Sequence, residues 1–104
     1  MSQYNYAPLR LFIDGRWIDR GGRDAHEVVN PATHDTIGEL PIATSADLDE
    51  ALAAAEQGFA VWRKSMPDER SAVLRKAAGL LRERAEQIAL VLVAENGKPR
   101  GEAM

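Results

Sequence analysis

The spacing of apolar residues changes at Thr44, and this change constrains the fold more than any other feature. Before Thr44, short runs of branched and aromatic residues are separated by turn-forming residues; after it, apolar residues recur every three or four positions. The first pattern is typical of short strands and the second of amphipathic helices. The sequence therefore predicts an α+β chain, in which N-terminal β-hairpins are followed by two or three amphipathic α-helices.

The strand-like part contains one strong turn signal. Residues 9–13 and 16–19 have strand character and flank an Asp-Gly pair at positions 14–15. This pair readily adopts the positive φ angles of a tight hairpin turn. Residues 25–29 and 36–40 are predicted as two further strands, with an Asn-Pro turn after the first of them.

The start of the chain is predicted to lie outside the folded part. Residues 1–8 are polar and aromatic and end at Pro8, so they are expected to form a flexible arm ahead of a domain that spans 9–104. A chain of 104 residues makes one domain. At that size we expect it to bury roughly 65% of its unfolded surface around one core.

The first helix has both a start signal and an apolar stripe. A hydroxyl at Thr44 and a carboxylate three residues later, at Asp47, can satisfy the free backbone donors of a helix start. The stripe follows steps of four, three, four and three residues, and consists of Leu48, Leu52, Ala55, Phe59 and Trp62. These signals predict a helix over about 46–64.

A second start signal follows directly. Ser65 is the expected cap, and Pro67 stands in the first turn, where its missing N–H is not needed. The apolar pattern then continues to the end of a helix at about residue 84. Another helix is predicted over 85–96, separated from the second one by little more than a bend.

Composition excludes several classes of function. Thirteen Lys and Arg residues against 16 Asp and Glu residues give a formal net charge of −3, which disfavours nucleic acid as a partner. No apolar run approaches the roughly 20 residues that span a bilayer, and the start lacks a signal peptide, so we expect a cytoplasmic chain with no membrane partner. The chain has no cysteine. Disulfides, thiolate metal sites and thiol catalysis are therefore excluded for these residues.

Gly97 and Lys98 raise the question of a phosphate-binding loop. Such a loop needs a second glycine five residues before the Gly-Lys pair and a hydroxyl residue after it, and this sequence has neither. Gly97 instead follows a helical run and precedes Pro99 by two residues. This arrangement is typical of a left-handed helix cap followed by a stop.

The same stretch, Glu95 to Pro99, resembles the Glu-x-Gly-Lys-Pro segment of the aldehyde dehydrogenase superfamily. The resemblance extends over about residues 9–104, in the order and spacing of the family's opening segments. It is carried by the segments 12–17 (FIDGRW), 29–33 (VNPAT), 51–55 (ALAAA), 60–63 (AVWR), 70–75 (RSAVLR) and 80–82 (LLR). Within the superfamily, residues 39–41 and 67–71 look most like the succinate-semialdehyde dehydrogenases.

The resemblance implies a fold and a role. In the family this segment is a peripheral part of the α/β NAD-binding domain. The full-length enzymes oxidise an aldehyde to an acid: a cysteine thiolate attacks the carbonyl, hydride passes to NAD or NADP, and a glutamate-activated water releases the acid. Those groups lie downstream of the Gly-Lys-Pro segment. The chain is therefore expected to be an N-terminal fragment that is inactive by itself, with no catalytic residue and no bound nicotinamide cofactor.

Two other functions stay open at this stage. The chain could be a stand-alone hairpin and helix module that binds a protein partner, or a regulatory nucleotide-binding domain. A reading frame that continues into a cysteine-containing family signature would favour the fragment. Measurable binding of NAD to this chain would favour the regulatory domain. The residues do not identify the substrate aldehyde.

The resemblance also implies half of a cation site. Several relatives hold a monovalent cation between backbone carbonyls before the Asn-Pro turn and an acidic residue before the Gly-Lys-Pro segment. By position, those groups are the carbonyls of Val28 and Val29 and the side chain of Glu95. Oxygen ligands suit a hard cation. The alternative for Glu95 is a solvated carboxylate near a helix end.

The remaining chemically suggestive residues have simpler explanations. His26 and His34 lack the spacing of a zinc site and are expected at the surface. The carboxylates Asp47, Asp49 and Glu50 fit the first turn of a helix, where the helix dipole favours negative charge.

Phe59 and Trp62 could stack on a ligand, but their place on the first apolar stripe favours a core or an interface with missing parts. Exposed apolar helix faces would make the chain self-associate or bind the remainder of the dehydrogenase.

Overall fold

The computed structural model describes residues 5–104 and has the predicted α+β class. The predicted arm over 1–8 falls partly on residues 1–4, which lie outside the described residues, and it stays a prediction. The elements of the described part are β1 (Leu11–Ile13), β2 (Arg16–Ile18), β3 (Ala25–Val29), β4 (Thr36–Pro41), α1 (Ser45–Trp62), α2 (Pro67–Glu83), α3 (Ala85–Asn96) and α4 (Arg100–Ala103).

The strands form two antiparallel hairpins. β1 pairs with β2, and both turn residues have positive φ, 52° at Asp14 and 73° at Gly15, as the Asp-Gly signal predicts. Phe12 and Trp17 face each other across this hairpin, with ring centroids 4.7 Å apart. β3 pairs with β4, and the ladder register shifts at the end of β3.

The helix ends follow their local signals with one exception. Gly97 caps α3 in the left-handed conformation, with φ of 75°, which confirms the cap interpretation. Ser65 was expected to cap α2, and this was wrong: its hydroxyl donates to the carbonyl of Trp62 in the last turn of α1. Met66 is the residue before α2, and its N–H is satisfied by the Glu69 carboxylate at 3.1 Å.

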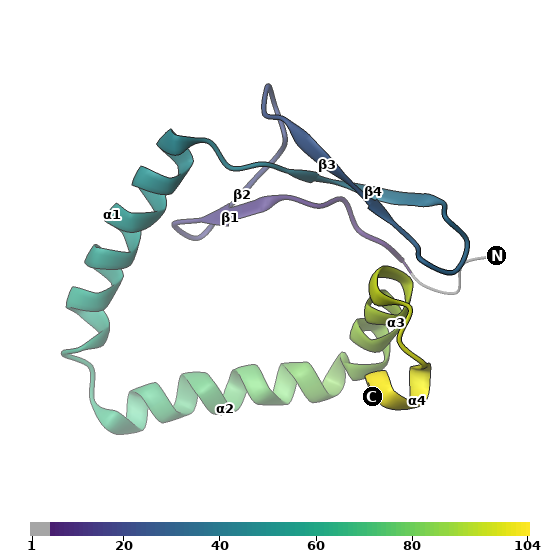
Figure 1. Cartoon of the computed structure of the whole chain (residues 1–104). Coiled ribbons are helices and arrows are strands. Elements are labelled where there is room, and N and C mark those ends of the chain that lie inside the picture. The colour runs from purple at the N-terminus through teal and green to yellow at the C-terminus, as the bar shows by residue number, and fades with distance from the viewer. Residues whose placement is uncertain (1–4) are drawn as a thin grey trace.

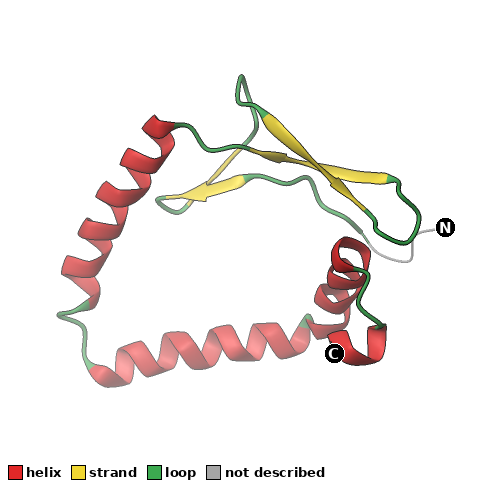
Figure 2. Cartoon of the chain, in the orientation of Figure 1, coloured by secondary structure: helices red, strands yellow, loops and turns green. Residues whose placement is uncertain are grey.

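The elements are arranged as an open frame. In Figure 1 the two hairpins form one side, α1 and α2 form two more sides that meet at a sharp corner, and α3 returns towards the β3–β4 hairpin. Figure 2 shows that no helix lies across the middle of this arrangement. Gly97 closes the frame, because it packs so tightly on Pro31 that a Cβ added to it would lie 2.9 Å from the proline Cγ.

The expectation of one sizeable core was wrong. Among the described residues, the only buried apolar side chains are small: Pro41, Ala89 and Ala94. The radius of gyration is 17.1 Å, whereas a compact chain of this length has one of about 13 Å. The chain exposes 8275 Å², against about 5,800 Å² for a compact protein of its mass. The reason is architectural: the helices are joined end to end around the frame and do not stack.

None of the helices within residues 5–104 combines the length and apolar character needed to cross a membrane.

Candidate functional site

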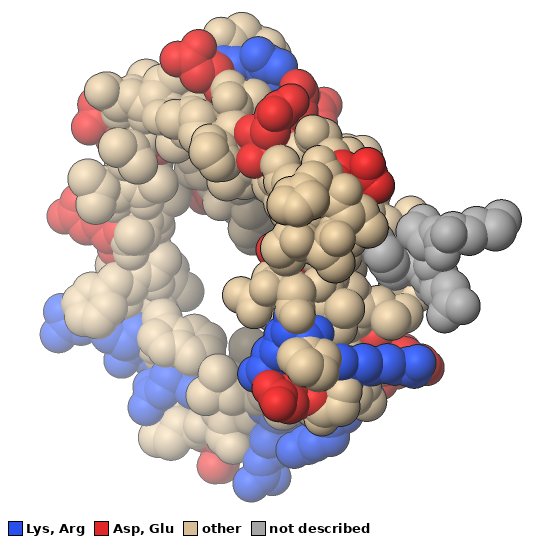
Figure 3. Space-filling view, turned by 45° about the vertical axis from the view of Figure 1, so that its right-hand side comes forward, with Lys and Arg blue, Asp and Glu red and all other residues tan. Residues whose placement is uncertain are grey.

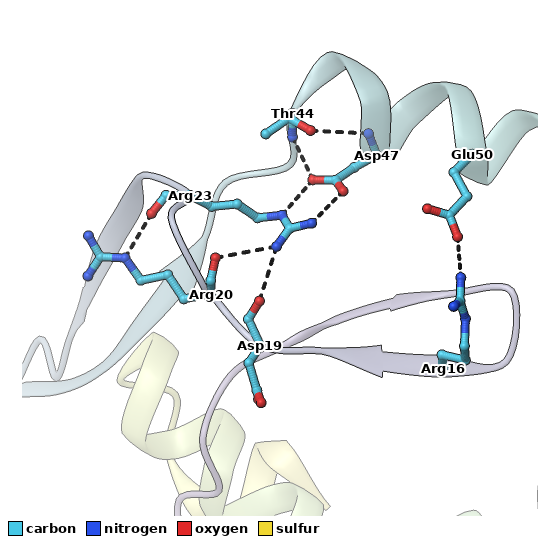
Figure 4. Close-up of polar contacts among 7 residues, drawn as sticks. All are labelled: Arg16, Asp19, Arg20, Arg23, Thr44, Asp47 and Glu50. Atoms are coloured by element: carbon cyan, nitrogen blue, oxygen red, sulfur yellow. Dashed lines mark hydrogen bonds and ion pairs between the residues drawn. The ribbon is translucent and has the colours of Figure 1, made fainter.

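A cluster of hydrogen-bonded side chains joins the hairpins to the start of α1. The guanidinium of Arg23 donates two hydrogen bonds of 2.7 Å to the Asp47 carboxylate, one to each oxygen (Figure 4). Asp47 also accepts from the backbone N–H of Thr44 at 2.8 Å, and the Thr44 hydroxyl accepts from the backbone N–H of Asp47 at 3.1 Å. The predicted cap is thus confirmed and extended by an ion pair.

The opposite charges of Arg23 and Asp47 are paired within this cluster. Hydrogen bonds from Arg23 and then from the Thr44 backbone hold the pKa of the Asp47 carboxyl well below its usual range, against the opposing effect of burial. The pKa of Arg23 is raised, mainly by its hydrogen bond to Asp47. A buried carboxylate that is paired with a guanidinium and held ionised is a poor proton acceptor. Asp47 is therefore a structural residue.

Further contacts fix the path of the loop that carries Arg23. Its guanidinium also donates to the carbonyls of Asp19 and Arg20, and the Arg20 guanidinium donates to the carbonyl of Arg23 (Figure 4). Arg16 on β2 pairs with Glu50 on α1. Local sequence patterns gave Asp47 as a cap but gave no signal for Arg23, because the pair spans 24 residues.

The residues proposed for a cation lie at the closing point of the frame. Val28 and Val29 end β3, and the ladder register shifts between them, which is a β-bulge or a similar irregularity. Glu95 is exposed in the last turn of α3, two residues before the glycine that packs on Pro31. The turn after β3 and the end of α3 are therefore neighbours, as the ligand set requires.

Tyr6 adds a group at this place that the sequence interpretation missed. Its hydroxyl donates to Glu95 Oε1 at 2.5 Å, and its ring lies against Gly38 of β4, where an added Cβ would be 2.7 Å from the ring. Sequence patterns gave no signal for this contact, because Tyr6 falls in the expected arm and the bond spans 89 residues. The oxygen donors of Val28, Val29 and Glu95 have the chemistry that a hard cation prefers.

The other candidates do not form a site. His26 and His34 are exposed, as predicted. Within residues 5–104 no three His, Asp or Glu side chains gather into a metal-binding group. Phe59 and Trp62 are both exposed, so of the two possibilities left open for them the structure favours an interface over a core.

Comparisons with known proteins agree with this arrangement. Residues 17–104 match the aldehyde dehydrogenase family. The malonate-semialdehyde dehydrogenase of Lacticaseibacillus casei is 35% identical over 103 residues, which are 99% of this chain and 21% of that enzyme. The chain thus spans about a fifth of the length of this curated relative.

Solved structures show the same correspondence. Aldehyde dehydrogenase C from Pseudomonas syringae, a mutant in complex with NAD⁺ and octanal, superimposes with a TM-score of 0.91 at 30% identity, over 99% of this chain and 22% of that one. Aldehyde dehydrogenase 21 from Physcomitrella patens, in complex with succinate, gives a TM-score of 0.85 at 34% identity, over 94% of this chain and 21% of that one. The chain therefore belongs to the aldehyde dehydrogenase family and matches the N-terminal region of these enzymes, which does not contain their catalytic residues.

Proposed function

We propose that this chain is the N-terminal scaffold of an NAD- or NADP-dependent aldehyde dehydrogenase, which oxidises an aldehyde to a carboxylic acid. In this role the hairpins and helices pack on the remainder of the enzyme and support its nicotinamide-binding domain. The chain itself cannot supply the thiolate nucleophile, because it has no cysteine. The remainder of the enzyme would bind the nicotinamide cofactor, which would supply the hydride acceptor.

One observation carries this proposal: the helices expose the apolar faces that should form a core. The exposed large apolar side chains of α1 and α2 are Leu48, Leu52, Phe59, Val61, Trp62, Val73, Leu74, Leu80 and Leu81. A soluble chain that folds alone covers most such side chains, whereas here they are exposed. Their exposure is the pattern expected where a further part of the protein covers them.

Complementation of a truncated relative tests the scaffold role. The Lacticaseibacillus casei relative, without the segment that aligns with this chain, is expected to reduce NAD⁺ poorly with malonate semialdehyde. Co-expression of the 104-residue chain is expected to form a stable complex and restore NAD⁺ reduction. Leu52→Asp together with Phe59→Asp should prevent this, and Gln57→Asp, an exposed position on the other side of α1, should not. A chain that forms no complex with the remainder, or rescues equally well with both variants, would contradict the scaffold role.

The substrate class of the whole enzyme is an aldehyde that also carries a carboxylate, as in succinate semialdehyde. Support comes from two relatives at 34–35% identity, the malonate-semialdehyde dehydrogenase and the enzyme solved with succinate. Other relatives are named for benzaldehyde or were solved with octanal, at 33% and 30% identity. In the complemented enzyme, kcat/KM for succinate semialdehyde should exceed that for octanal. The reverse order would exclude this substrate class.

A monovalent cation is the second part of the proposal. The carbonyls of Val28 and Val29 and the carboxylate of Glu95 would hold it, with a further ligand from the remainder of the enzyme. The ion would tie the end of β3 to the end of α3. Potassium should raise the melting temperature of the complemented enzyme more than an equal concentration of tetramethylammonium. Glu95→Gln should abolish the difference, and Glu102→Gln, on α4, should leave it unchanged.

A further inference from the structure

The corner between α1 and α2 presents two helix faces of opposite charge. α1 carries four carboxylates and no Lys or Arg, whereas residues 63–84 carry seven basic and three acidic side chains. Figure 3 shows mainly acidic side chains over the upper part of this view and mainly basic ones over the lower part, with some of the opposite charge in each. Both faces also expose leucine or phenylalanine, with Leu52 at 70%, Phe59 at 63%, Leu74 at 64% and Leu81 at 60%.

The two faces have the same internal pattern. On α1, an acidic residue directly follows a residue of the apolar stripe at two places. Asp49 follows Leu48, and Glu56 follows Ala55 seven residues later. On α2 a basic residue follows in the same way, as Arg75 after Leu74 and as Arg82 after Leu81. In each helix the charged pair therefore flanks the same side of the apolar stripe. Within residues 5–104 these four side chains make no intramolecular ion pair.

The charged residues of the two faces lie at similar distances from the corner between α1 and α2. At 1.5 Å per residue, Glu56 and Asp49 lie about 9 and 20 Å from the corner end of α1. Arg75 and Arg82 lie about 12 and 22 Å from the corner end of α2. α1 runs towards the corner and α2 runs away from it (Figure 1). If a two-fold axis parallel to the bisector of the angle between α1 and α2 relates two chains, α1 of one chain therefore lies antiparallel to α2 of the other.

We propose that the isolated chain forms a symmetric dimer in which α1 of each copy packs against α2 of the other. The stripes Leu48–Leu52–Phe59 and Leu74–Leu81 meet in the centre. Asp49 faces Arg82 and Glu56 faces Arg75 of the second copy, because antiparallel helices bring the same flank of both stripes together. The arrangement is self-complementary and closed, so it does not continue into a fibre.

The available surface is large enough for such a dimer. Each chain exposes 8275 Å², about 2,500 Å² more than a compact chain of its mass. A stable interface needs about 800 Å² from each partner. This inference does not rest on the scaffold role, because it concerns only the faces that the 104-residue chain exposes on its own. A scaffold that failed to rescue the truncated relative could still dimerise.

Light scattering on the 104-residue chain tests the dimer. The native chain should have about twice its monomer mass of 11.4 kDa at high concentration and should dissociate on dilution. The acid-reversed variant, Asp49→Lys with Glu56→Lys, and the base-reversed variant, Arg75→Glu with Arg82→Glu, should each dimerise at least about tenfold more weakly, because like charges then face each other.

Mixing the two variants separates the proposed interface from simple loss of folding. In an equimolar mixture every cross-chain pair is again opposite in charge, so a heterodimer should form. Lys76→Glu, on the opposite side of α2, should leave the native dimer intact. A native chain that stays monomeric, one that forms larger assemblies, variants that dimerise alone as well as the native chain, or a mixture that stays monomeric would each overturn the proposal.

Discussion

The junction between the hairpins and α1 differs sharply from α2 in the burial of its side chains. At the junction, Asp47 is buried and holds hydrogen bonds from Arg23 and Thr44. Along α2 no side chain is buried, although the helix is 17 residues long. Most of the stability of a helix in a protein comes from the packing of its apolar face and not from its propensity. The comparison indicates that the junction is held by contacts within this chain, whereas α2 depends on its own helix propensity and on a partner.

Replacing Asp47 should have the largest effect, because it breaks the junction. Asp47→Ala removes the partner of Arg23 and the acceptor for the Thr44 N–H together. The midpoint of urea unfolding, followed by circular dichroism at fixed chain concentration, should fall more than in any other variant below. Asp24→Ala, at an exposed aspartate beside Arg23, is the control. An equal change in both variants would show that the junction does not hold the hairpins to α1.

Acid should weaken the native junction in a defined direction. The pKa of Asp47 is lower in the folded chain than in the unfolded one. Its contribution to stability is therefore fully present above the ordinary aspartate pKa of about 3.9 and is lost as the pH falls towards the folded pKa. The difference in unfolding midpoint between the native chain and Asp47→Ala should shrink as the pH falls below about 4. A difference that is constant from neutral pH to strong acid would contradict this assignment.

Gly97→Ala should have the next largest effect, because it opens the frame on the far side from the junction. The position has φ of 75°, and the new Cβ would lie 2.9 Å from Pro31 Cγ. A non-glycine residue in this conformation costs about 1–3 kcal/mol. Gly101→Ala is the matched control, since no atom lies within 4 Å of its added Cβ. Equal unfolding free energies for the two variants would argue against a tight contact with Pro31.

Thr44→Ala should have a smaller effect at the junction. It removes the hydroxyl that accepts from the Asp47 N–H but leaves the bonds to Arg23 in place. Loss of such a cap costs about 0.5–2 kcal/mol. Ser45→Ala, the first residue of α1, is the control in the same urea titration. A loss as large as that of Asp47→Ala would mean that the cap, and not the ion pair, carries the junction.

Gly79→Ala should change stability least and in the opposite direction. Gly79 lies inside α2, and its added Cβ meets no atom within 4 Å. Alanine in a helix interior is favoured over glycine by about 0.5–1 kcal/mol. Helical circular dichroism should rise, whereas Gly22→Ala, in the loop before Arg23, should leave it unchanged. No gain at Gly79 would indicate that α2 is already held by contacts beyond its own propensity.

The cation site stays a prediction, and only part of its surroundings could be predicted from the sequence. Val28, Val29 and Glu95 came from the family resemblance and not from any local pattern. The structure brings the end of α3 to the turn after β3 through the contact of Gly97 with Pro31. The tyrosine that donates to Glu95 was missed, since nothing in residues 1–8 indicates a partner 89 positions away.

The sequence by itself determined the local features of this protein. The Asp-Gly turn, the cap at Thr44, the end of α3 at Gly97 and the helical periods depend on neighbours within about four residues, so they can be read directly from the order of amino acids. The absence of cysteine is equally plain. Only the tertiary structure decided that Arg23 meets Asp47, that Tyr6 meets Glu95, and that the apolar stripes of α1 and α2 stay exposed. Periodicity indicates which helix face is apolar, but whether that face is covered depends on the path of the whole chain, and this path leaves the frame open.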